Sequence, residues 1–303
     1  MQYSVPLMFG PSDSPTQHMA EIQQLTITSC DQHRFEAKLH ASDDAHSPLL
    51  IFLSAMGTPA RVYGRFAREM ALHGVQVCTA DWRGIGSSSM QAGRNCDWGY
   101  RHLVEHDLAA LLAALRERYP DTPIWLGGHS LGGQLSLLGA AANPAEVSGV
   151  LLVASGTVHL PCYSPAFRWR VRTLALISRI TGALLGHFPG KRLGFAAREA
   201  SSVMRDWSHV ARSGKYQPHG TSLNYEGAMR ALKLPVLALN FKADLWSPLA
   251  ATQALLGKVP ATRSVHWNWS KAETGDLEFD HFSWTKQPTV IAPALAQQIC
   301  HMT

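Results

Sequence analysis

The sequence has no long hydrophobic run and little cysteine, and these absences exclude several classes of protein. No run of about 18 apolar residues, the length that a membrane-spanning helix needs, occurs in the chain. The first 17 residues lack the basic and then apolar regions of a secretory signal. The five cysteines are odd in number, scattered and without a C-x-x-C pair, which predicts reduced, mostly buried thiols and neither disulfides nor a metal site. We expect a soluble cytoplasmic protein without metal or other cofactor.

One segment has almost no acidic residues. Residues 160–216 contain ten Lys and Arg but only one Asp and one Glu, so this segment carries +8 and the remaining chain −3. A solvated basic face is the simplest interpretation, and attraction of a phosphate-bearing ligand is the alternative. No nucleic-acid motif and no amphipathic terminal anchor accompany the charge, so neither nucleic acid nor stable membrane insertion is predicted. The oligomeric state stays open, a homodimer included.

Apolar segments of strand length alternate with helical patterns along the chain. Residues 24–28 and 34–40 alternate apolar and polar side chains around a turn, which predicts an antiparallel hairpin at a sheet edge. The other predicted strands are continuously apolar, as is typical of strands that are buried on both faces. These strands lie at residues 49–53, 75–80, 147–155, 234–240 and 265–269, and another one begins the segment 123–142.

The segment 123–142 reads as a strand, a sharp turn and a helix, with the motif G-x-S-x-G from Gly128 to Gly132. In such a turn the serine, Ser130, lies above the sheet edge, and the N–H groups at the start of the following helix point to the attacked carbonyl. A glycine-rich turn with a capping serine is the alternative, but the flanking strand and helix favour a nucleophile. At this point the sequence resembles the α/β-hydrolase superfamily. The resemblance implies a mostly parallel eight-stranded sheet, helices on both faces and a helical cap insertion.

The resemblance also assigns the partners of the serine. Asp244 follows the penultimate predicted strand, and His281 lies on the loop after the last one. The chain order Ser, Asp, His is the one that this fold uses for its catalytic triad. Asp276 and Asp280 lie too near His281 in the sequence to match the expected arrangement. His129 is next to the nucleophile and points elsewhere if the turn forms as expected.

The oxyanion hole departs from the commonest family pattern. After the strand at residues 49–53, many α/β-hydrolases have His-Gly, and the next residue gives one oxyanion N–H group. Here Ser54 and Ala55 stand at those positions. We therefore assign the two backbone N–H groups to Met56 and Leu131, since any residue type can supply a backbone amide.

Residues 81–88 resemble the D-x-R-G-x-G-x-S loop of the family. Its aspartate and arginine, here Asp81 and Arg83, usually hold the loop in shape. We assign them a structural role.

Residues 158–231 lack strand alternation and form the predicted cap, which we call the cap segment, between core regions 1–157 and 232–303. Apolar side chains recur at helical intervals, and Arg168, Arg172 and Arg179 occupy another face. The apolar positions are Phe167, Val171, Leu174, Ile177, Leu184 and Phe188. The chain also looks like a group of little-characterised bacterial α/β-hydrolases. The similarity lies at Trp207, residues 213–216, the Ala-Met-Gly loop at residues 55–57 and the Asp-His-Phe triplet at residues 280–282.

The expected function is that of a serine hydrolase that cleaves a carboxylic ester of a small or medium acyl substrate. Ser130 attacks, His281 moves the proton, Asp244 orients the imidazole, and an acyl-enzyme forms. A thioesterase or acyltransferase is the alternative, because the basic cap segment could attract a phosphate-bearing acyl thioester. Peptide and carbon–carbon bond cleavage stay open as well. A third hypothesis is a ligand-binding protein that has kept the fold without turnover.

Overall fold

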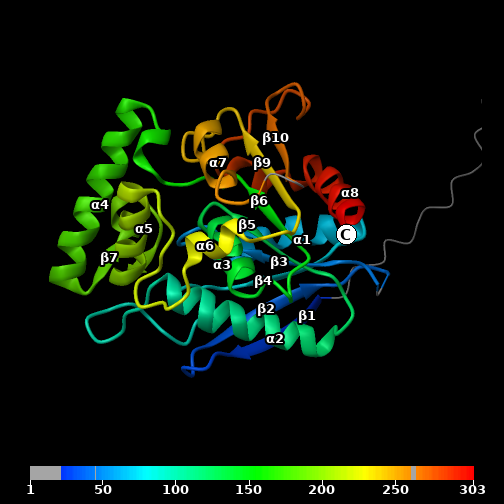
Figure 1. Ribbon diagram of the computed structural model, residues 1–303, viewed down its shortest axis with the longest axis horizontal. Coiled ribbons are helices and arrows are strands. Elements are labelled where there is room, and N and C mark those ends of the chain that lie inside the picture. The colour runs from blue at the N-terminus through cyan, green and yellow to red at the C-terminus, as the bar shows by residue number, and fades with distance from the viewer. Residues whose placement is uncertain (1–21, 45, 261–263) are drawn as a thin grey trace, which may run out of the picture.

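The computed structural model describes residues 22–44, 46–260 and 264–303, and these are organised around one eight-stranded sheet (Figure 1). The strand order is β1-β2-β4-β3-β5-β6-β9-β10, in which β2 is antiparallel to β1 and β4, and the remaining neighbours are parallel. The strands are β1 (Ile22–Thr28), β2 (Arg34–His40), β3 (Leu49–Leu53), β4 (Gln76–Ala80), β5 (Ile124–His129), β6 (Gly149–Val153), β9 (Val236–Phe241) and β10 (Ser264–Trp269). The predicted α/β class and the antiparallel edge hairpin are confirmed.

Helices cover both faces of the sheet because its central strands are apolar on both sides. In β3, Leu49 and Ile51 belong to one core cluster and Leu50 and Phe52 to the other. Burying each such side chain contributes roughly 1.5–3 kcal/mol. The first cluster packs against α2 (Ala109–Arg118), α3 (Leu131–Ala142) and the short α6 (Tyr225–Arg230), and α7 (Leu249–Leu256) adds Leu255 to it. The second packs against α1 (Gly64–Leu72) and α8 (Ala292–Met302).

A buried charge network fixes the loop that follows β4. Arg83 donates to both oxygens of Asp107 at 2.7 and 2.8 Å, and to both oxygens of Asp31 at 2.7 Å. Asp107 lies in a π-helical turn, His102–Leu108, which precedes α2. Asp81 accepts from the backbone of Ala60 at 2.8 Å. These contacts are those expected of Asp81 and Arg83 in a structural role.

The cap segment lies between β6 and β9, and its part from residue 165 to residue 213 forms one end of the molecule (Figure 1). It contains α4 (Pro165–Leu185), β7 (His187–Pro189), β8 (Arg198–Ala200), α5 (Ser201–Ser213) and, at its end, α6. The expectation that it lacks strands was wrong, since β7 and β8 pair antiparallel. Strands of three residues are too short to show a period-two pattern. The division into a core and a separate cap domain stays a prediction.

The apolar pattern of α4 is only partly buried. Val171 and Leu174 are buried, as expected, but Leu184 is 62% exposed. Leu184 lies 13 residues after Val171, and an α-helix turns by about 100° per residue, so the two side chains point about 140° apart.

Every helix of the described residues is too short or too polar to cross a lipid bilayer.

All five cysteines are free, but the expectation that most are buried was wrong. Only Cys78 is buried, while Cys96 and Cys162 are half-buried and Cys30 and Cys300 are exposed. Cys30 lies in the turn of the edge hairpin and Cys300 on the outer face of α8, where the core does not reach.

A carboxyl group is buried in the strand pair of the cap segment. Glu199 in β8 is 7% exposed, and the only hydrogen bond of its carboxylate among the described residues is from the Ala197 N–H group at 3.3 Å. No cation of the described residues forms an ion pair with it. Burial raises the pKa of Glu199 from 4.5 to about 7.

Glu199 should therefore make stability depend on pH. Between pH 4.5 and 7 the folded protein binds more protons at this residue than the unfolded chain, so the free energy of unfolding falls as pH rises through this window. Glu199→Gln removes this contribution. The free energy of unfolding of the variant minus that of wild type should therefore rise by about 3 kcal/mol as the pH goes from 4.5 to 8. Urea unfolding at several pH values measures the gain, and exposed Glu117→Gln is the control. Parallel curves for wild type and Glu199→Gln would contradict the prediction.

Candidate active site

Ser130 lies in the turn between β5 and α3, at the carboxyl end of a central strand. Its φ of 55° and ψ of −118° are strained for a residue with a side chain. The turn closes because Gly128 and Gly132 have no side chains: a methyl group at Gly128 would lie 2.5 Å from the backbone of Gly132, and one at Gly132 would collide with the Leu53 carbonyl oxygen. Ser155 Oγ donates to the carbonyl oxygen of Ser130 at 2.7 Å and further fixes the turn. The predicted sharp turn is therefore present.

The structure brings the three predicted side chains together. His281 Nε2 lies 2.9 Å from Ser130 Oγ, and His281 Nδ1 lies 2.7 Å from Asp244 Oδ2. Asp244 is 1% exposed, and its other carboxylate oxygen accepts from the N–H groups of Trp246 at 2.8 Å and Ser247 at 3.0 Å. These two backbone donors fix the carboxylate so that one oxygen faces the imidazole. The arrangement can take a proton from the serine and hold the resulting imidazolium.

A second histidine packs against the first. The rings of His129 and His281 lie 4.8 Å apart, and His129 is completely buried. Tyr63 Oη accepts from the Ala55 N–H group at 3.1 Å and so can donate to His129 Nδ1 at 2.8 Å. Burial, together with the nearby His281, holds the pKa of His129 well below 6.5. His129 is thus neutral and adds no positive charge beside the imidazolium. Its hydrogen bond points to Tyr63 and not to Ser130, as predicted.

Met56 and Leu131 both line the cavity beside Ser130. The N–H group of the preceding Ala55 is occupied by Tyr63. Among the described residues, no hydrogen-bond acceptor is found for the N–H groups of Met56 and Leu131. These two groups are therefore free to bind an oxyanion, which is the role predicted for them.

The cavity at Ser130 is small and largely enclosed by apolar side chains. Its volume is about 130 Å³. The cap segment closes it: Phe195 stacks on Trp246 at 5.0 Å, and the guanidinium of Arg170 lies 4.9 Å from the centre of the Trp246 ring. Residues that line the cavity include Ala55, Met56, Ser130, Leu131, Gln134, Val158, Arg170, Phe195, Trp207, Trp246, His281 and Phe282.

The cap segment also lies against the loop of residues 54–57 after β3, which contains Met56 and is called the oxyanion loop below. Gly57 has a φ of 67°, and a methyl group there would lie 2.6 Å from the backbone of Ala196. Sequence reasoning missed the contributions of Phe195, Trp246 and Tyr63. No local pattern signals them, because each acts through a residue far away in the chain.

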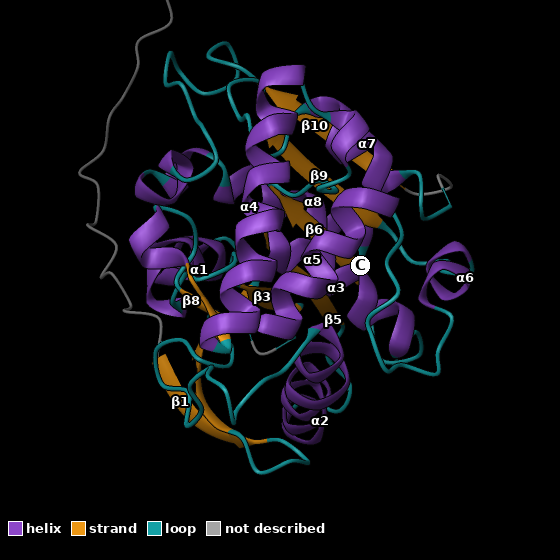
Figure 2. Ribbon diagram, turned by 90° about the vertical axis from the view of Figure 1, so that its left-hand side faces the viewer, coloured by secondary structure: helices purple, strands orange, loops and turns teal. Residues whose placement is uncertain are grey.

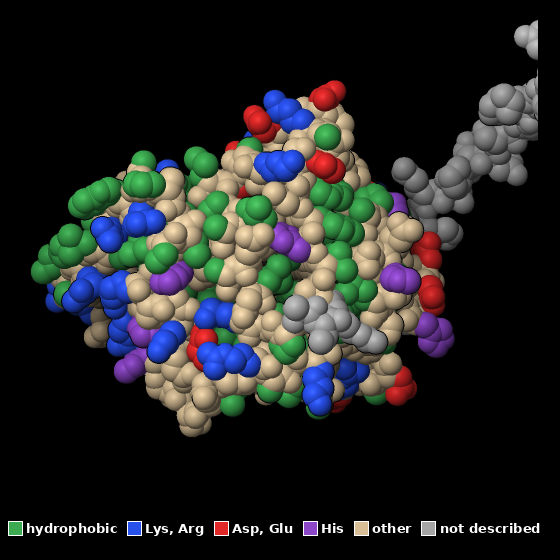
Figure 3. Space-filling model, turned by 45° about the horizontal axis from the view of Figure 1, so that its top comes forward, with side chains coloured by type: hydrophobic (Ala, Val, Ile, Leu, Met, Phe, Trp, Pro, Cys, Tyr) green, Lys and Arg blue, Asp and Glu red, His purple; other side chains and the backbone are tan. Residues whose placement is uncertain are grey.

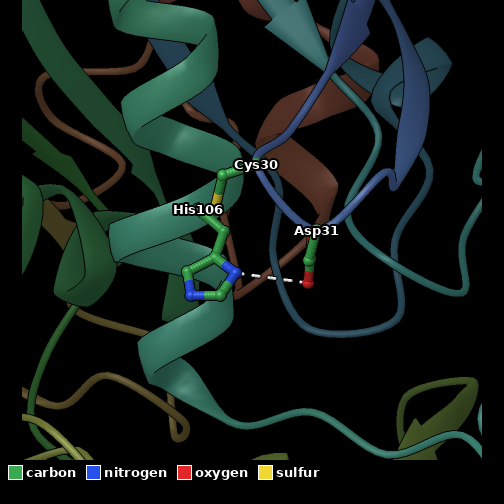
Figure 4. Close-up of side chains that lie close together, drawn as sticks. All are labelled: Cys30, Asp31 and His106. Carbon is green, nitrogen blue, oxygen red and sulfur yellow. Dashed lines mark ion pairs between the residues drawn. The ribbon is translucent and has the colours of Figure 1, made fainter.

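One group of side chains outside this cavity has ligand types typical of metal sites: Cys30, Asp31 and His106 (Figure 4). His106 Nδ1 lies 3.2 Å from Asp31 Oδ2. Both oxygens of Asp31 already accept from Arg83, whose guanidinium holds the pKa of Asp31 well below its usual range. A cation in this place would be repelled by Arg83, so we assign no metal site here.

The comparison with known protein families agrees with the fold. A model of the family described as serine aminopeptidase S33 matches residues 44–267. The chain belongs to this family of α/β-hydrolases. The resemblance predicted from the sequence is therefore confirmed.

Individual relatives match shorter stretches. Monoglyceride lipase of Homo sapiens is 29% identical over 202 residues, which cover 64% of this chain and 65% of that protein. Monoglyceride lipase of Mus musculus is 31% identical over 144 residues, 46% of each chain, so the chain spans about half the length of this curated relative. The crystal structure of the esterase domain of a Rhodothermus marinus protein superposes with a TM-score of 0.62 at 17% identity, over 93% of this chain and 98% of that one. This structural match shows the shared fold.

Replacing Asp244 by Asn should leave the packing intact but present the wrong hydrogen-bonding partner to His281 Nδ1. The imidazole then adopts the tautomer that cannot accept the serine proton, and kcat for ester hydrolysis should fall about 10⁴-fold.

The matched control is Asp280→Asn, next to His281 in the sequence. Asp280 is exposed and caps the backbone N–H groups of Phe282 and Ser283. The asparagine amide keeps the accepting oxygen, so kcat should stay within about threefold of wild type. This change is much smaller than the one that loss of a triad member causes. A larger loss in Asp280→Asn than in Asp244→Asn would refute the assignment of the acid.

Proposed function

We propose that the protein is a serine hydrolase that cleaves carboxylic esters with a short acyl chain. The observation that carries the proposal is the hydrogen-bonded chain from Ser130 through His281 to Asp244, at the floor of an enclosed apolar cavity. The monoglyceride lipases that match this chain are named for ester cleavage and support the same reaction class.

The reaction begins when Ser130 Oγ attacks the ester carbonyl carbon while its proton passes to His281 Nε2. The carbonyl oxygen becomes an oxyanion, which accepts from the N–H groups of Met56 and Leu131; each such donor is typically worth about 2.7–4 kcal/mol. Asp244 stabilises the imidazolium. When the tetrahedral intermediate collapses, the carbon–oxygen bond to the alcohol breaks, and His281 gives its proton to the departing oxygen.

An acyl ester on Ser130 remains after the alcohol has left. Water then loses a proton to His281 and attacks the acyl carbon. A second oxyanion forms in the same hole, and its collapse returns the proton to Ser130 and releases the carboxylic acid.

The size of the cavity supports a short acyl chain. Its volume of about 130 Å³ is close to that of cavities of about 150 Å³ that hold a benzene-sized molecule, so it encloses about six carbon atoms. Phe195 and Trp246 close the wall against a longer chain.

A thioesterase or acyltransferase is the second candidate. It is favoured by Arg170, which lines the cavity, and by the basic cap segment around it, because an anionic acyl donor would be attracted there. Comparing an ester with the thioester of the same acid, with and without an added alcohol, distinguishes the three reactions.

Hydrolysis of p-nitrophenyl esters of increasing acyl length tests the leading proposal. Turnover should be greatest at about four to six carbons and fall steeply beyond, because the enclosed cavity is then full. Ser130→Ala should lower kcat by roughly 10⁶-fold, as loss of the nucleophile of a serine hydrolase does. Circular dichroism establishes that the variant is folded. Full turnover in Ser130→Ala, or a preference for long chains, would contradict the proposal.

A further inference from the structure

A second cavity lies between α4 and α5 of the cap segment, away from the one at Ser130. Its volume is about 460 Å³, and it shares no lining residue with the first cavity. Figure 2, in which the cap segment faces the viewer, shows the two helices side by side. Three arginines line the cavity: Arg179 from α4, and Arg205 and Arg212 from α5.

The spacing of residues on α5 builds this cavity. Ser201, Arg205, Ser208 and Arg212 recur at intervals of four, three and four residues, so they form one stripe along the helix. On the facing side of α4, Gly182 has no side chain; a methyl group there would lie 3.0 Å from Ser201 Oγ. The absence of a side chain at Gly182 keeps room between the helices.

The guanidinium groups of the three arginines are not engaged by other side chains in the part of the chain that the structure describes. Among the described residues, none of their guanidinium groups forms a hydrogen bond or an ion pair. Asp97 also lines the cavity, but its two oxygens accept from the N–H group of Ser202 at 3.0 Å and from its Oγ at 2.6 Å. Three positive charges against one engaged carboxylate produce a field that attracts an anion.

Two hydroxyl groups in this wall also lack a partner. Ser208 is 1% exposed, and neither Ser208 Oγ nor Ser201 Oγ has a hydrogen-bond partner among the described residues. A buried polar group without a partner typically costs about 1–3 kcal/mol. Ser201 and Ser208 are seven residues apart on α5, about 10 Å along its axis, so one anion reaches only one of the two hydroxyl groups. An anion at Ser208 could accept from its hydroxyl group and from the guanidinium groups beside it.

A neighbouring cavity extends this one along α4. Its volume is about 340 Å³, and it shares Arg179 and Arg212 with the cavity between α4 and α5. It adds a further arginine, Arg172, and the apolar side chains of Val171, Ala175 and Leu176. Figure 3 shows Lys and Arg side chains next to hydrophobic ones at this end of the molecule. The two adjacent cavities therefore share two arginines, and the neighbouring one adds apolar side chains of α4 beside them.

We propose that the arginine and serine cavity between α4 and α5 binds the phosphate group of an organic phosphate ester, with the apolar part of the ester along α4. The planar guanidinium groups suit bidentate contact with phosphate oxygens. Such a group can come from a soluble phosphate ester or from the headgroup of an anionic lipid. The site is independent of Ser130, so its test does not depend on the hydrolase assignment.

Calorimetric titration of the full chain with hexyl phosphate and with inorganic phosphate tests the proposal. Hexyl phosphate should bind at one saturable site, and more tightly than inorganic phosphate because of its apolar chain. Replacing Arg205 and Arg212 together by Gln should weaken binding at least tenfold, since each charge-assisted hydrogen bond contributes more than a neutral one. Ser208→Ala should weaken it about threefold.

The control is Lys215→Gln, which removes one positive charge from the cap segment at a position that lines neither cavity. The affinity of this variant for hexyl phosphate should stay within about twofold of wild type, because only a screened long-range charge is lost. Circular dichroism and the midpoint of thermal unfolding establish that each variant is folded.

Sedimentation with vesicles distinguishes the two sources. If the source is a lipid headgroup, the protein should sediment with phosphatidylcholine vesicles that contain phosphatidic acid, hexyl phosphate should release it, and the double arginine variant should stay in the supernatant. If the source is soluble, hexyl phosphate should bind without vesicle binding. Failure of hexyl phosphate to bind at millimolar concentration would overturn the proposal. An equal loss of affinity in Lys215→Gln and in the double arginine variant would also overturn it, since general charge would then suffice.

Discussion

The close approach of β3, β5 and the start of α3 is the constraint on which the site depends. Gly128 and Gly132 permit it, because a side chain at either position would collide with backbone atoms. The strained backbone of Ser130 follows from this packing, and so does the direction in which the first N–H groups of α3 point. The burial of two apolar core clusters, one on each face of the sheet, holds the three elements together against that strain.

The loops at the carboxyl ends of the parallel strands converge on the place that this turn defines. Asp244 follows β9 and His281 follows β10, and each is fixed by backbone contacts or aromatic packing before substrate arrives. The neutral His129 continues this arrangement inward, where it connects the imidazole of His281 to Tyr63 and the oxyanion loop. Catalytic groups that are already oriented need little reorganisation during the reaction.

The sequence predicted the elements whose signals are local. The glycine-flanked serine and the edge hairpin depend on short patterns that a single chain displays, and the resemblance to the α/β-hydrolases then assigned Asp244 and His281 after their strands. The short strands β7 and β8 were missed, because three residues carry no periodicity. The wall formed by Phe195 and Trp246 could not be read either, since their contact joins residues about fifty positions apart. Leu184 belongs to the series of apolar residues in α4 but is exposed, because over 13 residues the series no longer matches the turn of the helix.

The central claim is that Ser130 is activated by His281, and labelling with a fluorophosphonate probe tests it most directly. The probe reacts with a serine only when a neighbouring base takes its proton. The account predicts one covalent adduct, which peptide mapping places on Ser130, and labelling at least a hundredfold slower in folded His281→Gln, within the range that a positioned base contributes. A folded wild-type protein without an adduct at Ser130, or one labelled equally fast in His281→Gln, would contradict the account.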